Sequence, residues 1–95
     1  MFTKDELHVL EHALGIERAL ETSGYHYKRH GKQYVKSYRN YYCADKGHDE
    51  YMTWKRLVDR HYADFWYDGD YVYFKVSDSG KEELQKQREY EIKWI

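Results

Sequence analysis

The sequence contains no proline and a single cysteine, its formal net charge is only −1, and it lacks any long apolar run. One cysteine, Cys43, cannot form an intramolecular disulfide, and this favours a reducing, cytoplasmic setting. Without a sufficiently long apolar run, neither a signal peptide nor a membrane span is expected. A chain of 95 residues is expected to form one domain, residues 1–95, with a small core.

Tyrosine is abundant, with 12 residues, and charge is unevenly distributed. Between Tyr25 and Tyr42 there are five lysine or arginine residues and no acidic residue, so the rest of the chain is acidic overall. Cations between aromatic residues are typical of single-stranded nucleic-acid binding, in which cations contact phosphates and rings stack on bases. An exposed loop with solvated charges is the alternative. The candidate nucleic-acid-binding residues are Lys28, Arg29, Lys32, Lys36, Arg39, Tyr25, Tyr27 and Tyr34.

The clearest helix signal lies at the N-terminus. Thr3 is followed three residues later by Glu6, and this spacing predicts a capping box at the start of a helix over about Lys4–Leu14. Gly15 suits the left-handed conformation that commonly ends a helix. The first helix is therefore expected to present a leucine stripe to the core.

The same helix contains the pattern H-x-x-E-H at His8, Glu11 and His12. Two histidines four residues apart share one helix face and can hold a metal, as in a group of zinc proteases. A motif this short has a high false-positive rate, and a chain of this size has little room for a third ligand and a substrate cleft. The favoured interpretation is two solvent-facing histidines, with no metal site.

The segment after the first helix is less regular. Glu17–Thr22 is compatible with a short helical turn, and Ser23-Gly24 and His30-Gly31 predict breaks in the chain, so the path of residues 17–37 is left open. Tyr38–Ala44 is rich in residues that favour strands and is expected to pair with a later hairpin. In that strand, Cys43 is expected to be a small buried residue.

A second helix is expected to begin between His48 and Glu50, followed by a β-hairpin. Asp68-Gly69 is a strong signal for a two-residue turn, because a type I′ turn needs positive φ at both central positions. The residues of the helix expected to point inward are Tyr51, Trp54, Leu57, Val58 and His61. The expected hairpin pairs are Phe65 with Val72 and Ala63 with Phe74 on the core face, and Trp66 with Tyr71 and Asp64 with Tyr73 on the outer face.

The C-terminal part begins with Ser77, whose hydroxyl is expected to cap a helix that starts at Asp78. Beyond Leu84 this helix is so polar that only propensity is expected to hold it. Apolar residues then alternate with charged ones, which is a strand period. Ile92, Trp94 and Ile95 are expected to dock on the outer face of the hairpin near Trp66 or across a homodimer interface, with a frayed end as the alternative.

These elements predict an α+β domain in the order α-β-α-β-β-α, with an Asp-Gly β-hairpin. The expected core comprises Leu7, Leu10, Leu14, Tyr41, Trp54, Leu57, Val58, Phe65, Val72, Phe74 and Leu84.

The pattern Val76-Ser77-x-x-Gly80-Lys81-x-x-Leu84, which follows Leu57-Val58 and an aromatic hairpin, resembles winged-helix proteins. Members of that family cap the helix after the wing with Ser or Thr, and a glycine follows three residues later. With Tyr38–Tyr42 and the capped first helix added, the chain is similar to small phage or prophage proteins of Gram-positive bacteria. The resemblance covers about residues 38–87, with weaker agreement over 2–16, and implies a small winged-helix-like domain in the cytoplasm of a bacterial host cell.

Phage proteins of this size often regulate phage genes or block a host process, including antiviral defence such as CRISPR systems. The resemblance therefore implies either a protein-binding inhibitor or a DNA-binding regulator. Two features differ from DNA-binding members: only one helix fits before the hairpin, and Asp68 and Asp70 at its tip would repel phosphate.

We therefore expect a non-enzymatic protein, without cofactor or metal, that contacts a host or phage protein. The alternative is a nucleic-acid-binding transcriptional regulator that uses the basic segment of residues 25–42. The candidate protein-binding residues are Trp66, Tyr71, Tyr73, Asp64, Asp68, Asp70 and Trp94.

Overall fold

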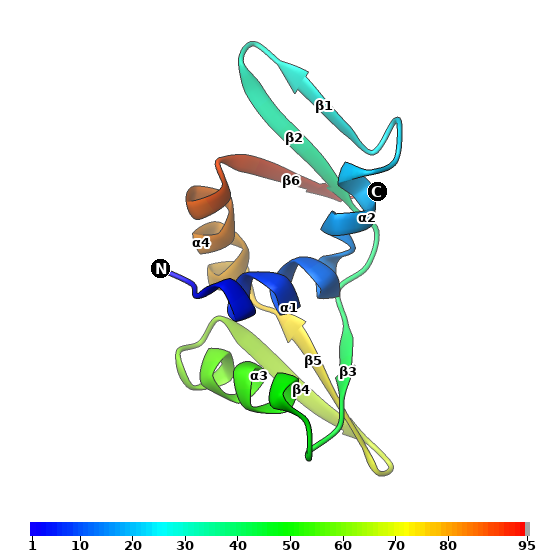
Figure 1. Ribbon diagram of the computed structural model, residues 1–95, viewed down its shortest axis with the longest axis vertical. Coiled ribbons are helices and arrows are strands. Elements are labelled where there is room, and N and C mark those ends of the chain that lie inside the picture. The colour runs from blue at the N-terminus through cyan, green and yellow to red at the C-terminus, as the bar shows by residue number, and fades with distance from the viewer. Residues whose placement is uncertain (95) are drawn as a thin grey trace.

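The computed structural model describes residues 1–94, which form an α+β fold of four helices and six strands (Figure 1). The α+β class predicted from the sequence is confirmed. The elements are α1 (Lys4–Leu14), α2 (Ile16–Leu20), β1 (His26–Arg29), β2 (Lys32–Ser37), β3 (Tyr42–Ala44), α3 (Asp49–Asp59), β4 (Ala63–Asp68), β5 (Tyr71–Val76), α4 (Asp78–Arg88) and β6 (Tyr90–Trp94).

Two three-stranded sheets lie at opposite ends of a molecule that measures 44 × 24 × 19 Å, with α1 between them (Figure 1). The first sheet has the order β1-β2-β6, in which β1 is antiparallel and β6 parallel to β2. The second sheet has the order β3-β5-β4 and is antiparallel throughout. The predicted element order lacked α2, β1, β2 and β6, so it missed the whole first sheet.

The first helix begins and ends as its sequence predicts. The backbone N–H of Glu6 donates to the hydroxyl of Thr3, and the carboxylate of Glu6 accepts from the backbone N–H of Thr3. Gly15 ends the helix with a φ of 73°. The ring of Tyr38 lies so close to Gly15 that an added Cβ would lie 2.6 Å from a ring carbon. The left-handed backbone therefore favours glycine, while the Tyr38 ring, which is the end of an exposed side chain, would have to move to admit a Cβ.

The core surrounds α1, which contributes five apolar side chains to it. In the second sheet, the ring of Trp54 from α3 stacks on Phe74 from β5 with centroids 5.3 Å apart, and both residues are fully buried. In the first sheet, Val35 of β2 is fully buried. The fully buried or nearly buried apolar residues are Phe2, Leu7, Val9, Leu10, Ala13, Leu14, Ile16, Ala19, Val35, Ala44, Trp54, Leu57, Ala63, Val72, Phe74, Val76, Leu84 and Tyr90.

Several side chains expected in the core are exposed. Tyr41 is 53% exposed because it precedes β3 and lies outside the sheet, and Phe65 is 44% exposed because it lies on β4, the edge strand of its sheet. Val58 is only partly buried. His61 is exposed in a left-handed conformation after α3, with a φ of 65°. Cys43 is exposed because it lies on the outer face of its strand.

The register of β4 and β5 differs from the predicted one. Asp68 pairs with Tyr71, so the central turn residues are Gly69 and Asp70 rather than Asp68 and Gly69. Of these two turn residues only Gly69, with a φ of 61°, has a positive φ, as in hairpin turns that begin with glycine. The pairs are therefore Phe65 with Phe74, Trp66 with Tyr73, Ala63 with Val76 and Asp64 with Lys75. Aromatic residues then face each other across the strands, which stabilises this register.

A second hairpin, β1–β2, occupies the segment whose path the sequence left open. Its turn residues, His30 and Gly31, have φ values of 52° and 78°, the two positive values of a type I′ turn. The predicted break at this pair is therefore the turn of a hairpin. The short helix before it, α2, begins one residue earlier than the predicted helical turn over Glu17–Thr22.

The C-terminal segment forms β6, a strand as its alternating pattern predicted, and it pairs with β2. The predicted docking of this segment near Trp66 is wrong, because Val35 and Ile92 are partners in the first sheet. Ile95 lies outside the described residues. The homodimer stays a prediction. The C-terminal segment is paired with β2, so it is not an unpaired apolar tail that would need a second copy to cover it.

Helix α4 is held by hydrogen bonds that its polar sequence did not suggest. The amide of Gln87 accepts from the backbone N–H of Phe2 at 2.7 Å and donates to its carbonyl at 3.0 Å. The side chain of Gln85 accepts from the backbone N–H of Ile92 at 2.8 Å. These bonds tie the polar half of the helix to the N-terminus and to β6, so helix propensity is not its only support.

Candidate functional site

Alternation along the strands of the second sheet separates a buried face from an outer face. Val72, Phe74 and Val76 of β5 are buried towards α1 and α3, and the residues between them point outward. We call the outer side of this sheet the aromatic–acidic face. Its residues are Cys43, Asp64, Trp66, Asp68, Tyr71, Tyr73 and Lys75.

Trp66 and Tyr73 form the centre of the aromatic–acidic face. They are direct partners across β4 and β5, and their rings stack with centroids 5.4 Å apart and planes within 13°. Trp66 remains 41% exposed. Charge interaction with Cys43, followed by partial loss of hydration and by Asp68, raises the pKa of Tyr73, so its hydroxyl stays protonated at neutral pH. The pair offers a preformed aromatic surface.

Acidic side chains flank the stacked pair along the same hairpin. Asp64 lies opposite Lys75, and Asp68 lies opposite Tyr71, which is 59% exposed. Asp70 lies in the turn itself. The structure thus brings together six of the seven predicted protein-binding residues at one end of the molecule.

The seventh residue, Trp94, does not belong to this group. It lies on β6 in the other sheet, where the ammonium of Lys81 lies 4.2 Å from the centroid of its ring. Its predicted place beside the hairpin is wrong because β6 pairs with β2.

Sequence reasoning missed two exposed aromatic residues at the same hairpin. Phe65 and Tyr67 alternate with Trp66 along β4, so they point to the opposite side of this edge strand. Phe65 lies 5.6 Å from the ammonium of Lys55, and Tyr67 lies 5.5 Å from that of Lys46. The strand period predicted Phe65 on the core side, but tertiary structure leaves both side chains exposed on an edge strand.

The outer side of the first sheet has a different composition, and we call it the basic–aromatic face. Val35 and Ser37 of β2 are buried towards the helices, so the residues that alternate with them along the strand point outward. The residues of this face are Tyr27, Arg29, Lys32, Tyr34, Lys36, Glu91 and Lys93.

A second stacked pair lies at the centre of the basic–aromatic face. Tyr27 and Tyr34 are direct partners, and their rings stack with centroids 4.9 Å apart and planes within 12°. The ammonium groups of Lys32 and Lys93 lie 5.7 and 5.5 Å from the ring centroid of Tyr34. Both lysines also contact the carboxylate of Glu91, at 3.0 and 3.5 Å.

These contacts bias the protonation of the charged groups. The hydrogen bond from Lys32 lowers the pKa of Glu91, and the same bond raises the pKa of Lys32. Lys32 and Glu91 are therefore both charged at neutral pH, and the four lysine and arginine residues of this face outnumber its single acid. Lys93 is a member that the sequence did not indicate, because only the pairing of β6 with β2 brings it there.

Three predicted nucleic-acid-binding residues lie elsewhere. Lys28 alternates with Tyr27 and Arg29, so it points to the opposite side of β1. Tyr25 precedes β1 and packs edge-on against Tyr38. The guanidinium of Arg39 donates to the carbonyl oxygen of His12 at 2.7 and 3.2 Å, and this bond satisfies the C-terminal end of α1.

The H-x-x-E-H residues have structural partners. The carboxylate of Glu11 is buried and accepts hydrogen bonds from Arg88 and Tyr90, both at 2.8 Å. His8 lies 3.0 Å from the carboxylate of Glu17. Within residues 1–94, no group of three or more histidine, cysteine, aspartate or glutamate side chains is arranged to hold a metal ion.

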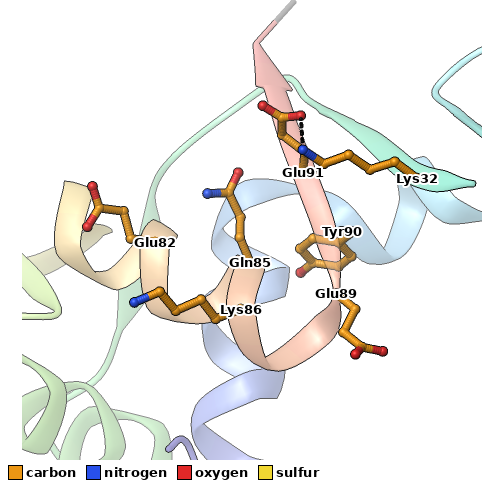
Figure 2. Close-up of a pocket in the computed structure, with 7 residues that line it drawn as sticks. All are labelled: Lys32, Glu82, Gln85, Lys86, Glu89, Tyr90 and Glu91. Carbon is orange, nitrogen blue, oxygen red and sulfur yellow. Dashed lines mark ion pairs between the residues drawn. The ribbon is translucent and has the colours of Figure 1, made fainter. Parts of the chain in front are cut away.

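An open depression of about 470 Å³ lies between α4 and β6 (Figure 2). It is lined by side chains of both charge signs, and several of these already have partners: Lys32 pairs with Glu91, and Gln85 accepts from Ile92. The hydroxyl of Tyr90 is engaged by Glu11. The depression therefore offers no convergent set of polar groups for a small ligand. Its lining residues are Lys32, Glu82, Gln85, Lys86, Glu89, Tyr90 and Glu91.

Comparisons with protein-family models, with curated proteins and with solved structures found no match to the chain. None of the helices in residues 1–94 has the length and apolar character needed to cross a membrane.

Proposed function

We propose that this protein is a non-enzymatic binding module that contacts another protein through its aromatic–acidic face. The observation that carries the proposal is the stacked pair on the outer side of the β3-β5-β4 sheet, in which Trp66 is exposed and Tyr73 is half-buried. Exposed aromatic residues grouped on one face commonly mark interaction sites, since leaving them in water is unfavourable.

The stacked pair has the properties of an interface hot spot. Tryptophan and tyrosine contribute the largest share of binding energy in many interfaces. Stacking already restricts the side chains of Trp66 and Tyr73, so little conformational entropy remains to be lost when a partner binds. Tyr71, 59% exposed on the same face, extends the aromatic area.

The charges around the pair indicate the chemistry of the partner. Asp64, Asp68 and Asp70 surround it, and Lys75 is the single basic residue of the face. A partner surface with lysine or arginine around an apolar centre would match both the charge and the aromatic patch. We propose a host or phage protein with such a surface.

We also propose a winged-helix-like shape and a role as an inhibitor of host antiviral defence. The sequence of α3, the β4–β5 pair and the Ser77-capped α4 supports a winged-helix-like shape, and the resemblance to small phage proteins supports an inhibitor of host antiviral defence in the bacterial cytoplasm. The acidic residues at the tip of β4–β5 argue against docking of this hairpin on DNA.

Affinity purification from a nuclease-treated lysate of a Gram-positive host tests the proposal. Nuclease treatment removes proteins that co-purify through nucleic acid. The wild-type chain is expected to retain a defined protein, and Trp66→Ala is expected to lose most of it, because removal of a hot-spot residue costs roughly 2 kcal/mol or more. Tyr41→Ala removes a tyrosine that is 53% exposed and lies outside the face, and it is the control. Equal recovery with Trp66→Ala and wild type, or recovery of no protein at all, would contradict the proposal.

A further inference from the structure

We infer that the basic–aromatic face is a second binding site and that its ligand is single-stranded nucleic acid. The site differs from the aromatic–acidic face in composition and position. The two sheets lie at opposite ends of the 44 Å long axis, so a partner bound at one face leaves the other face accessible (Figure 1).

Positive charge is concentrated on the outer side of the first sheet. The outer side of β1-β2-β6 holds Arg29, Lys32, Lys36 and Lys93 against the single acid Glu91, although the whole chain has a formal net charge of −1. The Debye length is about 8 Å at physiological ionic strength, so acids at the far end of the molecule are screened from a strand bound here. The local positive charge therefore determines whether phosphates are attracted.

The cations of the face that have no carboxylate partner are the ones best suited to bind phosphate. Within residues 1–94, no carboxylate lies within 4 Å of the side-chain nitrogens of Arg29 or Lys36. Lys36 follows Lys32 by four residues along β2, ~13 Å at the rise of a β-strand, so the cations form a track rather than a point. Such a track suits an extended chain of phosphates more closely than a single small anion.

The stacked tyrosines supply the second requirement. Tyr27 lies on β1, which is the edge strand of its sheet, and it is 40% exposed. One side of its ring contacts Tyr34, and no further strand among residues 1–94 covers the other side. An unpaired base can continue this stack, because every base offers an aromatic face regardless of its identity.

The same geometry selects single strands over duplexes. In a duplex the faces of the bases are occupied by their neighbours, so only the phosphates would be available to this surface. A single strand can present both phosphates to the cations and bases to Tyr27. Glu91 holds Lys32 and Lys93 beside the ring of Tyr34, which keeps the cations next to the stacking position before the ligand arrives.

Fluorescence anisotropy with the full chain tests the inference. The probes are labelled oligothymidine and oligouridine of roughly 16 nucleotides, the upper end of site sizes for single-strand-binding folds, and a duplex of the same length. The two single strands distinguish DNA from RNA. Binding at low salt is expected to be tighter for single strands than for the duplex and to weaken with salt, with a slope of about −0.7 for each phosphate neutralised.

Matched substitutions on β1 locate the site. Tyr27→Ala is expected to weaken single-strand binding roughly 5- to 100-fold through loss of stacking, and Tyr27→Phe is expected to retain it. Arg29→Ala is expected to reduce the magnitude of the salt slope by about 0.7. Lys28→Ala removes a charge from the neighbouring position on the opposite side of the strand and is expected to change affinity by less than about threefold.

Several results would overturn the inference. These are absence of binding at low salt, equal affinity for the duplex, and equal effects of Lys28→Ala and Arg29→Ala. Undiminished binding by Tyr27→Ala would also exclude the stacking site. Trp66→Ala, on the other sheet, is expected to bind the probes as wild type does, so the two proposals can fail separately.

Discussion

Tyr90 donates a hydrogen bond of 2.8 Å to the carboxylate of Glu11, a residue 79 positions earlier in the chain. The guanidinium of Arg88 donates to the other oxygen of the same carboxylate, also at 2.8 Å. Glu11 is only 6% exposed, so both bonds compensate for the loss of hydration of a buried charge. The pair joins the end of α4 and the start of β6 to α1, and it gives Glu11 a structural role.

This contact predicts a loss of stability at alkaline pH. Burial first, and then the charge and hydrogen bond of Glu11, raise the pKa of Tyr90 well above its ordinary value of 10.0. Above about pH 10 the unfolded chain releases the phenolic proton while the folded chain retains it, so stability falls as pH rises, by at most about 1.4 kcal/mol per pH unit. Urea unfolding at several values between pH 9 and about 11 measures this fall.

Tyr90→Phe isolates the contribution of this group. The variant is expected to be less stable than wild type at pH 8, by about 1–3 kcal/mol, because the buried Glu11 loses a donor. It is also expected to show a shallower alkaline fall. Identical slopes for the two proteins would place the alkaline transition elsewhere.

Replacement of Gly80 by alanine is expected to destabilise the fold. A Cβ at this position would overlap the carbonyl oxygen of Tyr62 and would lie 2.9 Å from a methyl carbon of Val76. Because the main obstacle is backbone, the overlap cannot be relieved by rotating a side chain, and Gly80→Ala is expected to cost about 1–3 kcal/mol. Gly47→Ala, where nothing lies within 4 Å, is the control and is expected to stay within about 0.5 kcal/mol of wild type. Similar melting temperatures for the two variants would contradict this packing.

Phe74 and Phe65 are partners across the hairpin but are expected to respond differently to truncation. Phe74 is fully buried against Trp54, so Phe74→Ala is expected to cost about 3–5 kcal/mol and to threaten folding of so small a domain. Phe65 is 44% exposed, so Phe65→Ala is expected to cost clearly less. Thermal unfolding followed by circular dichroism measures both. A larger loss for Phe65→Ala would mean that the two sides of the hairpin are interchanged.

Removal of residues 91–95 is expected to lower the melting temperature. The deletion eliminates most of β6, uncovers the buried Val35 and removes the bond between Ile92 and Gln85. Loss of one buried aliphatic side chain costs roughly 1.5–3 kcal/mol, and each kcal/mol shifts the melting temperature of a domain this size by about 4–8 °C. An unchanged melting temperature would contradict the pairing of β6 with β2.

Light scattering on the full chain and on the variant that lacks residues 91–95 tests the homodimer. A dimer that dissociates on deletion would show that the C-terminal segment also contributes to an intermolecular contact. A wild-type monomer would exclude the predicted dimer.

Local signals in the sequence were sufficient for the elements whose causes are local. The Thr3 and Glu6 capping box and Gly15 predicted α1 as Lys4–Leu14, and Ser77 predicted the start of α4. The aromatic outer side of the β4–β5 hairpin followed from strand alternation, which is unchanged because each partner shifts by two residues, as from Val72 to Phe74 opposite Phe65. Trp66 and Tyr73 were therefore found on the correct face before their stacking was known.

The composition of the candidate faces was decided only by tertiary structure. Lys93 reaches Tyr34 because β6 pairs in parallel with a strand more than fifty residues earlier, and no local pattern specifies such a pairing. The same pairing places Trp94 in the first sheet, whereas the other six predicted protein-binding residues belong to the β4–β5 hairpin.

Local patterns in the sequence were enough to locate the starts of α1, α3 and α4, the alternation of residues along β4 and β5, and the gathering of positive charge in residues 25–42. Tertiary structure decided which strands are neighbours, and hence that the charge of β1 and β2 is completed by Lys93 and that Arg39 is used to satisfy α1. The physical reason is that caps, turns and alternation depend on contacts a few residues apart. Strand partners depend on which distant surfaces bury each other best, and this is a property of the whole chain.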